Sequence, residues 1–144
     1  MNNTLIKFGY PESVIKSYEH WSVLLRPEQV TLGSLILASH SHTYAFGDLS
    51  ELAMQELSTI TKDIEASLNN CFNYDKVNYL MLMMVDPHVH FHVIPRYSTP
   101  REYQTLTIKD EFWPGPPDLS HKVSLNLTQK TSLLEYLKAQ WISY

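Results

Sequence analysis

The sequence predicts an α+β domain in which a mostly antiparallel sheet packs against two helices. Three observations indicate this class. An amphipathic helical pattern occupies residues 48–70, short runs of strand-type residues lie on both sides of it, and a second helical pattern covers residues 131–141. The chain is long enough for one sizeable core, and neither a linker nor a repeat divides it, so we expect a single domain over residues 1–144.

The first part of the chain is predicted to supply two strands. Residues 4–10 are a short apolar segment, and a strand is expected at Trp21–Leu25. After a turn at Arg26–Pro27, a second strand is expected at Val30–Ala38, antiparallel to the first because the connection is short. Gly33 interrupts this run, which indicates a bulge or a close approach of another part of the backbone.

The clearest element is a helix that begins near Asp48. Asp48 and Glu51 resemble a capping box in which Asp replaces the usual Ser or Thr. The helix is expected to end near Asn69–Asn70. Its apolar residues recur at helical spacing and form one stripe: Leu49, Leu52, Ala53, Leu57, Ile60, Ile64 and Leu68.

Two more strands are predicted after this helix. Val77–Val85 is a nearly continuous apolar run of strand length, so we expect a strand in the centre of the sheet. A turn at Asp86–Pro87 leads to a strand at His88–Ile94, which Pro95 is expected to end.

The C-terminal part is predicted to be irregular and then helical. Tyr97–Ser120 has no clear period and contains a stiff aromatic loop at Phe112–Pro117. Thr131–Trp141 is expected to be a short helix with its apolar residues on one face.

Composition limits the possible partners. The formal net charge of −4 argues against a broad nucleic-acid surface, and no apolar run approaches the ~20 residues of a membrane span. The single cysteine, Cys71, excludes an internal disulfide framework. Because the N-terminus does not resemble a signal peptide, we expect a cytoplasmic protein.

The candidate functional residues are three of the seven histidines, which alternate with apolar residues in the last predicted strand: His88, His90 and His92. Successive side chains of a strand point to opposite faces. All three imidazoles are therefore predicted to share one face, while the apolar residues that alternate with them enter the core.

Three interpretations of this pattern are open. The first is a polar strand that happens to use histidine. The second is a metal site, but the first and third histidines would be about 13 Å apart along a strand, and no spacing nominates a further ligand. The third is nucleophilic catalysis, in which an imidazole attacks phosphorus and forms a covalent intermediate. This last interpretation needs neither a metal nor a cofactor, and we predict none.

The stretch His88–Arg96, His-Val-His-Phe-His-Val-Ile-Pro-Arg, resembles the signature of the histidine-triad (HIT) family, His-φ-His-φ-His-φ-φ with φ apolar. The order of the predicted elements and the Trp113-Pro-Gly-Pro-Pro segment resemble the family as well. The chain is most similar to bacterial members of the diadenosine tetraphosphate hydrolase-like branch.

This resemblance implies a five-stranded, mostly antiparallel sheet with two helices, usually as a homodimer. It implies hydrolysis or transfer at the α-phosphate of dinucleoside polyphosphates or nucleoside phosphoramidates. His90 matches the family's nucleophile, which forms a nucleotidyl-histidine. His92 matches the histidine that contacts the α-phosphate, and His88 matches a residue of the supporting hydrogen-bond network.

The sequence departs from the family's pattern where substrate is usually held. Ser34 replaces a common histidine, no acid or amide lies at Leu24–Pro27, and Met83–Pro87 replaces a Gly-rich loop. Two other functions are therefore kept as alternatives: a nucleotide-binding regulatory protein with little turnover, and a metal-dependent hydrolase that uses two of the histidines.

Three further residues are candidates for substrate binding. Arg26 lies at the turn where the family holds nucleotide, and Arg96 lies just after the histidines, so either guanidinium is a candidate for binding phosphate. Trp113 is a candidate for closing over a base or for crossing a dimer interface.

Overall fold

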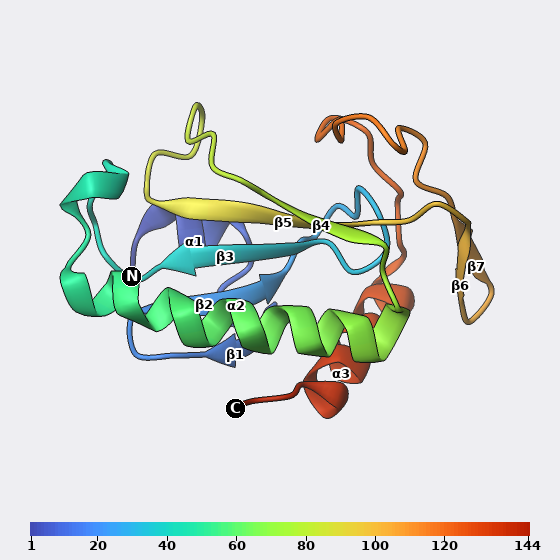
Figure 1. Ribbon diagram of the computed structural model, residues 1–144, viewed down its shortest axis with the longest axis horizontal. Coiled ribbons are helices and arrows are strands. Elements are labelled where there is room, and N and C mark those ends of the chain that lie inside the picture. The colour runs from blue at the N-terminus through green and yellow to red at the C-terminus, as the bar shows by residue number, and fades with distance from the viewer.

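The computed structural model describes residues 1–144, and its centre is a five-stranded antiparallel sheet in the order β1-β2-β3-β5-β4 (Figure 1). The strands are β1 (Val14–Ser17), β2 (Trp21–Leu25), β3 (Leu35–Ser39), β4 (Lys76–Leu80) and β5 (His90–Arg96). The predicted fold class is confirmed, with three α-helices instead of two: α1 (Asn3–Lys7), α2 (Glu51–Phe72) and α3 (Leu127–Gln140). No helix is both long and apolar enough to cross a membrane.

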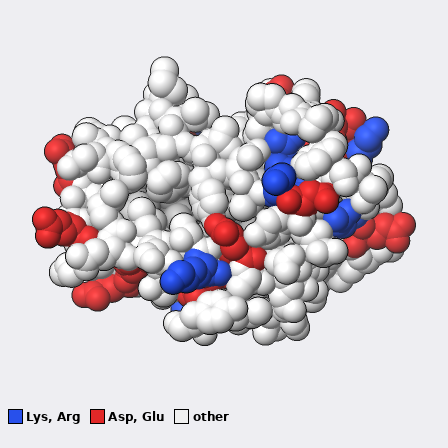
Figure 2. Space-filling model, viewed as in Figure 1, with Lys and Arg blue, Asp and Glu red and all other residues white.

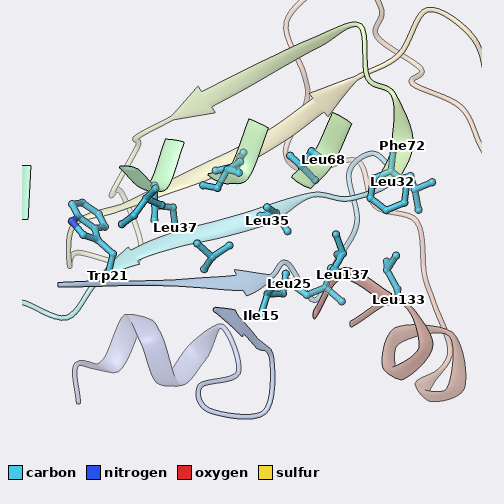
Figure 3. Packing of buried hydrophobic residues seen from close by; sticks show 14 of the residues in the cluster. Ile15, Trp21, Leu25, Leu32, Leu35, Leu37, Leu68, Phe72, Leu133 and Leu137 are labelled. Carbon is cyan, nitrogen blue, oxygen red and sulfur yellow. The ribbon is translucent and has the colours of Figure 1, made fainter. Parts of the chain in front are cut away.

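The two faces of the sheet are covered differently. The long helix α2 runs across one face, and α1 lies on the opposite face (Figure 1). Alternate residues of β2 and β3 pack with α2 and α3 in the main core, as Figure 3 shows for Trp21, Leu35 and Leu137. The residues between them form a smaller cluster with Leu5 and Phe8 on the α1 side.

The N-cap of the long helix lies two residues after the predicted one. Asp48 belongs to a short 3₁₀ turn, η1 (Phe46–Asp48), so the predicted Asp48 capping box is wrong. Ser50 is the N-cap instead, and its hydroxyl accepts a hydrogen bond from the Ala53 N–H at 3.1 Å. Either residue has an oxygen suited to capping, and only the backbone geometry decides which one is used. The helix ends at Phe72, and the C-cap residue Asn73 has a left-handed conformation, with φ 49°.

The strand predicted in the centre of the sheet is an edge strand. β4 covers only the first part of the apolar run, and it pairs with β5 alone. Residues 81–85 leave the sheet and form the connection to β5. The run was predicted to be central because it is apolar, but apolarity does not distinguish a buried strand from a half-buried edge strand that continues into an exposed apolar loop.

The histidine strand is displaced by two residues from its predicted position. β5 begins at His90 and includes Pro95, so the prediction that Pro95 ends the strand is wrong. The Pro95 carbonyl accepts a hydrogen bond from the Thr31 hydroxyl at 2.5 Å, so its backbone groups point away from β4. At this position the missing N–H removes no bond between β4 and β5. As predicted, Val89 and Val93 enter the main core, with Phe91 packed against it.

The turn before β3 explains Gly33. Its φ is +86°, and a Cβ there would lie 2.7 Å from the Phe72 ring, so a side chain approaches Gly33 closely where the sequence predicted a bulge or the approach of another part of the backbone. β3 begins only at Leu35, because residues 30–34 form a turn. The buried side-chain amide of Gln29 stabilises this turn. Its oxygen accepts hydrogen bonds from the backbone N–H groups of Gly33 and Ser34, and its nitrogen donates to the carbonyls of Arg26 and Ser34.

Four helices and strands have no counterpart in the sequence predictions. They are α1, the short strand β1, and a hairpin of β6 (Arg101–Tyr103) and β7 (Leu106–Ile108) within the segment predicted to be irregular. α3 also begins earlier than predicted, because Asn126 and Gln129 form a capping box.

Candidate active site

His90 is held in one tautomer by the backbone. It lies on β5 opposite Ala38, on the face that α1 covers, and is 1% exposed. Its Nδ1 is 2.7 Å from the carbonyl oxygen of His88. A carbonyl only accepts hydrogen bonds, so Nδ1 carries a proton, and in the neutral ring Nε2 keeps a free lone pair. A neutral imidazole with a free Nε2 is the form that can attack an electrophile.

His92 is held in the opposite tautomer, because its Nδ1 accepts a hydrogen bond instead of donating one. The Nε–H of Arg26 donates to His92 Nδ1 at 3.4 Å, so the ring proton resides on Nε2. Burial lowers the pKa of His92 to about 4, and positive charge on His90 and Arg26 adds to this shift, against a smaller opposing effect of Asp86. His92 is therefore neutral at pH 7 and offers an N–H beside His90, whose ring centroid is 5.2 Å away.

His88 precedes β5 and joins it to α1. The hydroxyl of Thr4 accepts a hydrogen bond from the His88 backbone N–H at 3.3 Å and lies 3.0 Å from His88 Nδ1. The rings of Tyr44 and His42 lie against the imidazole, with centroids at 5.0 and 5.9 Å. Desolvation lowers the pKa of His88, and the neighbouring histidines lower it further. His88 thus has packing and hydrogen-bond partners typical of a supporting residue.

The N-terminal segment forms a wall over the histidines. Phe8 follows α1, and its ring centroid lies 5.5 Å from that of His90 and 6.0 Å from that of His92. The side chain of Asn2 caps α1 and also donates to the carbonyls of Ser39 and Ser41, which fixes the helix to the end of β3. The position of Phe8 is therefore set by hydrogen bonds at the far end of a five-residue helix.

A cleft opens beside His92 and has two adjoining lobes, which share Arg26, Asp86, His92 and Lys122. The polar lobe, about 290 Å³, is lined by Lys7, Phe8, Arg26, Pro27, Glu28, Asp86, His92 and Lys122. The apolar lobe, about 430 Å³, is lined by Arg26, Leu82, Met83, Met84, Val85, Asp86, His90, His92, Leu119, Ser120 and Lys122. We call the two together the histidine cleft. It is large enough for a small organic phosphate.

Arg26 is the buried cation of this cleft. It is 9% exposed, and besides His92 its guanidinium donates to the carbonyls of Glu28 and, at 3.4 Å, Leu119. It takes part in none of the four ion pairs of the structure. Burial lowers its pKa, which the charge of Glu28 partly offsets. A buried guanidinium without a carboxylate partner favours an anion beside it.

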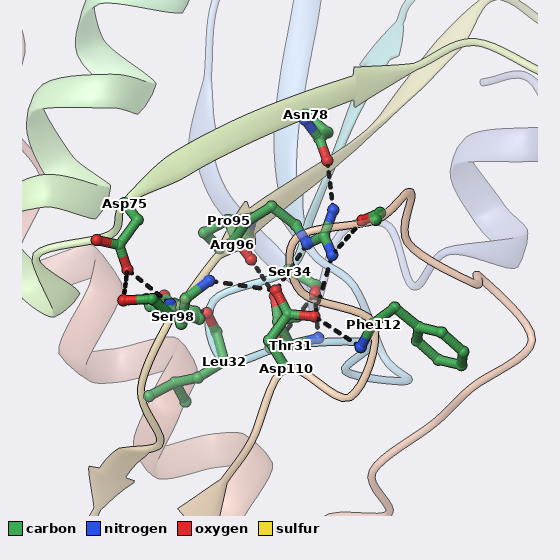
Figure 4. Close-up of polar contacts among 12 residues, drawn as sticks. Thr31, Leu32, Ser34, Asp75, Asn78, Pro95, Arg96, Ser98, Asp110 and Phe112 are labelled. Carbon is green, nitrogen blue, oxygen red and sulfur yellow. Dashed lines mark hydrogen bonds and ion pairs between the residues drawn. The ribbon is translucent and has the colours of Figure 1, made fainter.

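Arg96 lies elsewhere, in a buried ion pair. It is 3% exposed, and its guanidinium binds both carboxylate oxygens of Asp110, at 2.7 and 3.1 Å. It also donates to the side chain of Asn78 at 2.9 Å and to the carbonyl of Gly115 at 2.8 Å (Figure 4). Its donors are occupied within the protein. Our prediction that Arg96 binds substrate phosphate is therefore not supported by its placement, and we assign it to the structure of this region.

Trp113 is also outside the histidine cleft. With Arg96 it lines a separate groove of about 790 Å³ between β4 and the 113–117 loop. Of the three predicted substrate-binding residues, the structure thus brings only Arg26 to the histidines. It places Trp113 beside the open edge of the sheet, where an interface role remains a prediction.

Several residues of the cleft carried no signal in the sequence. Phe8 and Lys7 come from the N-terminal segment and Lys122 from the segment before α3, and only folding brings them to the histidines. Lys7 forms an ion pair with Asp86 at 2.7 Å, which joins α1 to the β4–β5 connection. No group of three or more His, Cys, Asp or Glu side chains is arranged to hold a metal ion.

The comparison with known families agrees with this geometry. The family model of the HIT domain matches residues 10–99, which include β1 to β5 and all three histidines. The chain belongs to the HIT family. No curated protein sequence matches it significantly.

Solved structures of HIT proteins share the fold. A histidine triad protein from Marinobacter aquaeolei superposes with a TM-score of 0.76 at 20% identity, covering 98% of this chain and 94% of that one. One from Bradyrhizobium japonicum gives 0.74 at 18% identity, with 99% and 97% covered. A structure described as a histidine triad nucleotide-binding protein, from Sulfolobus tokodaii, gives 0.70 at 17% identity, with 95% and 88% covered.

Proposed function

We propose that this HIT protein is a nucleotide hydrolase or nucleotidyl transferase that acts at an α-phosphate through a nucleotidyl-His90 intermediate. The substrates are dinucleoside polyphosphates, nucleoside phosphoramidates or similar nucleotidyl compounds. The observation that carries the proposal is the hydrogen bond between His90 Nδ1 and the His88 carbonyl, because it leaves Nε2 free for attack beside a cleft with a buried cation.

The reaction has two steps. In the first, the lone pair of His90 Nε2 attacks phosphorus, a P–N bond forms, and the bond from phosphorus to the leaving group breaks with its electron pair on the leaving group. In the second, water attacks phosphorus, the P–N bond breaks, and the pair returns to Nε2 while the water releases a proton. An alcohol or amine in place of water gives transfer instead of hydrolysis.

The neighbouring residues have distinct roles in this proposal. His92 donates its Nε2–H to a phosphoryl oxygen or to the bridging atom, since Arg26 occupies its other nitrogen. Arg26 itself supplies positive charge to the phosphoryl group. His88 has a supporting role. Its backbone carbonyl accepts a hydrogen bond from His90 Nδ1, and its ring Nδ1 lies within hydrogen-bond distance of the Thr4 hydroxyl.

Intact-mass spectrometry tests the covalent step. The wild-type protein is mixed briefly with adenosine phosphoramidate or diadenosine tetraphosphate, and we expect a mass increase of one adenylyl group. His90→Ala should show no adduct and no turnover, because no other group takes the place of the nucleophile. His20→Ala, a histidine at the β1–β2 turn, is the matched control and should behave like wild type.

The same experiment separates the other two functions. Adduct formation that continues in the presence of a chelator agrees with the covalent route, whereas product formation that stops with chelator would indicate a metal-dependent hydrolase. Nucleotide binding without adduct or product would identify a binding protein. An adduct that persists in His90→Ala would refute the assignment of the nucleophile.

We also propose that the chain forms a homodimer, as is usual in the family. The open edge of β4 and the groove beside it, lined by Trp113, support this proposal.

A further inference from the structure

The connection between β4 and β5 exposes an unusual amount of apolar surface. Leu82 is 52% exposed, Met84 87% and Val85 82%. The five residues 81–85 are all apolar, and the space-filling view shows no Lys, Arg, Asp or Glu on the protrusion that this connection forms at the upper left (Figure 2). Isolated exposed apolar residues are ordinary, but a contiguous group marks a surface that binds something.

This apolar group is part of the histidine cleft. The same lobe that contains His90 is lined by Leu82 to Val85 and by Leu119. His90 does not line the polar lobe. A phosphorus atom within reach of His90 Nε2 therefore lies in the lobe to which Leu82 to Val85 and Leu119 contribute apolar side chains.

The cations of the apolar lobe are sufficient for one phosphate group but not for a polyphosphate. Arg26 and Lys122 are its cations, and Asp86 is an anion. Lys7, the remaining cation of the cleft, is already paired with Asp86. The polyphosphate that leaves from a dinucleoside polyphosphate carries several negative charges, and Leu82 to Val85 provide no donor side chain for them.

We propose that Leu82, Met84 and Val85 form the leaving-group subsite of this enzyme and select substrates in which an apolar group, such as an alkyl or aryl amine, is attached to the nucleoside phosphate. The inference rests on the proposed function and goes beyond it, because it chooses between its two substrate classes. It assigns the selection to the β4–β5 connection, which is where this chain has apolar residues in place of a Gly-rich loop.

The chemical step for such a substrate is balanced without a further reactant. His90 Nε2 forms its bond to phosphorus while the bond between phosphorus and the amine nitrogen breaks. The nitrogen keeps the electron pair and takes a proton from water, so the amine leaves neutral. The hydroxide that remains attacks phosphorus, the P–N bond to His90 breaks with its electron pair returning to Nε2, and the nucleoside monophosphate is released.

The test is a leaving-group series on one nucleotide. The values of kcat/KM are measured for adenosine 5′-phosphoramidates that carry an N-methyl or an N-hexyl group, and for diadenosine tetraphosphate. We expect the wild type to prefer the hexyl over the methyl compound by about tenfold, which corresponds to the removal of about two methylene groups from water. Diadenosine tetraphosphate is expected to be the poorest of the three.

A loop variant and a matched control locate the preference. In Leu82→Ser/Met84→Ser the ratio of hexyl to methyl should fall toward one, because two of the three apolar side chains of the subsite become polar and neither of them packs against the main core. Leu127→Ser, which changes a leucine that is 79% exposed on α3, should keep the wild-type ratio. Circular dichroism confirms that each variant is folded.

The outcomes distinguish this inference from the function on which it rests. A His90 adduct with all three compounds and no preference for hexyl would overturn the subsite while keeping the covalent mechanism. A preference that survives in Leu82→Ser/Met84→Ser, or that disappears in Leu127→Ser, would overturn the assignment to this loop. Absence of any adduct would overturn the proposed function itself, and the subsite with it.

Discussion

At the scale of single residues, the most informative contact is the hydrogen bond from Arg26 to His92. The sequence predicted Arg26 as a residue that meets phosphate, and the structure shows that its guanidinium sets the tautomer of His92. Two carbonyl oxygens fix the guanidinium, so it cannot turn away from His92 without losing those hydrogen bonds.

Arg26→Met removes both the charge and the Nε–H donor. We expect kcat/KM to fall by about 100-fold, the size seen when one donor to a transition-state charge is lost. Nitrogen NMR of the histidine rings should show His92 with both tautomers populated in Arg26→Met and with only Nε2 protonated in wild type. Arg26→Gln keeps a donor without the charge and is the control. An unchanged ring spectrum in Arg26→Met would contradict the tautomer assignment.

The pKa of His92 also makes a prediction about stability. In the folded protein it is about 4, against an ordinary value of 6.5. Between these values the unfolded chain binds a proton that the folded chain does not, so the free energy of unfolding falls as pH is lowered from 6.5 toward 4. Above pH 6.5 both states are neutral at this position, and the contribution is constant.

Urea denaturation at several pH values between 4 and 7.5 measures this dependence. Because carboxyl groups titrate in the same range, wild type is compared with His92→Asn, which cannot take up the proton. We expect the urea midpoint of wild type to drop more steeply below pH 6.5 than that of the variant. Parallel curves for the two proteins would show that His92 titrates normally in the folded state.

At the scale of elements, the Arg96–Asp110 pair joins β5 to the loop before Trp113, and Asn78 extends the network to β4 (Figure 4). The sequence placed Arg96 next to the histidines, but strand geometry carries each further residue ~3.3 Å along β5, so four residues move the side chain well beyond the cleft. A buried guanidinium that already has a carboxylate is a structural group, whereas Arg26, which lacks one, is available to a substrate.

Arg96→Met tests this division of roles. Removing one partner of a buried pair leaves the Asp110 carboxylate uncompensated, so we expect a loss of about 3–5 kcal/mol in the free energy of unfolding. At temperatures where Arg96→Met is still folded, its KM for the nucleotide should equal that of the wild type. Lys138→Met, which breaks an exposed ion pair on α3, is the control and should cost less than about 1 kcal/mol. A raised KM in folded Arg96→Met would restore its predicted role in substrate binding.

At the scale of the whole molecule, the sequence predicted the features that depend on the local spacing of apolar residues. The alternation around His90 gave the face of β5 correctly, and the spacing of apolar residues gave α2. The sequence did not predict that β4 lies at the edge of the sheet. An edge strand has one neighbouring strand and a central strand has two, and the residues of a single strand do not specify its neighbours. The walls of the cleft were missed for the same reason: Phe8 and Lys122 lie more than a hundred positions apart, and folding alone brings them together.

The open edge of β4 leads to the prediction about assembly. Val77 pairs with Pro95, whose carbonyl points away from β4 toward Thr31, so in an antiparallel ladder the Val77 backbone groups point outward from the sheet. An edge strand with free N–H and C=O groups is a template for a second copy. The neighbouring groove, with Trp113 on its wall, adds surface for burial.

Sedimentation equilibrium tests whether two copies meet there. We expect wild type to be a dimer at micromolar concentration, and Val77→Pro to dissociate at least about tenfold more readily, because the outward N–H is lost while the bonds from β4 to β5 remain. Leu127→Ser, on α3, should remain dimeric. If Val77→Pro stays as tight a dimer as wild type, the two copies meet through another face. A monomeric wild type would contradict the proposed homodimer and would show that the edge of β4 stays open in solution.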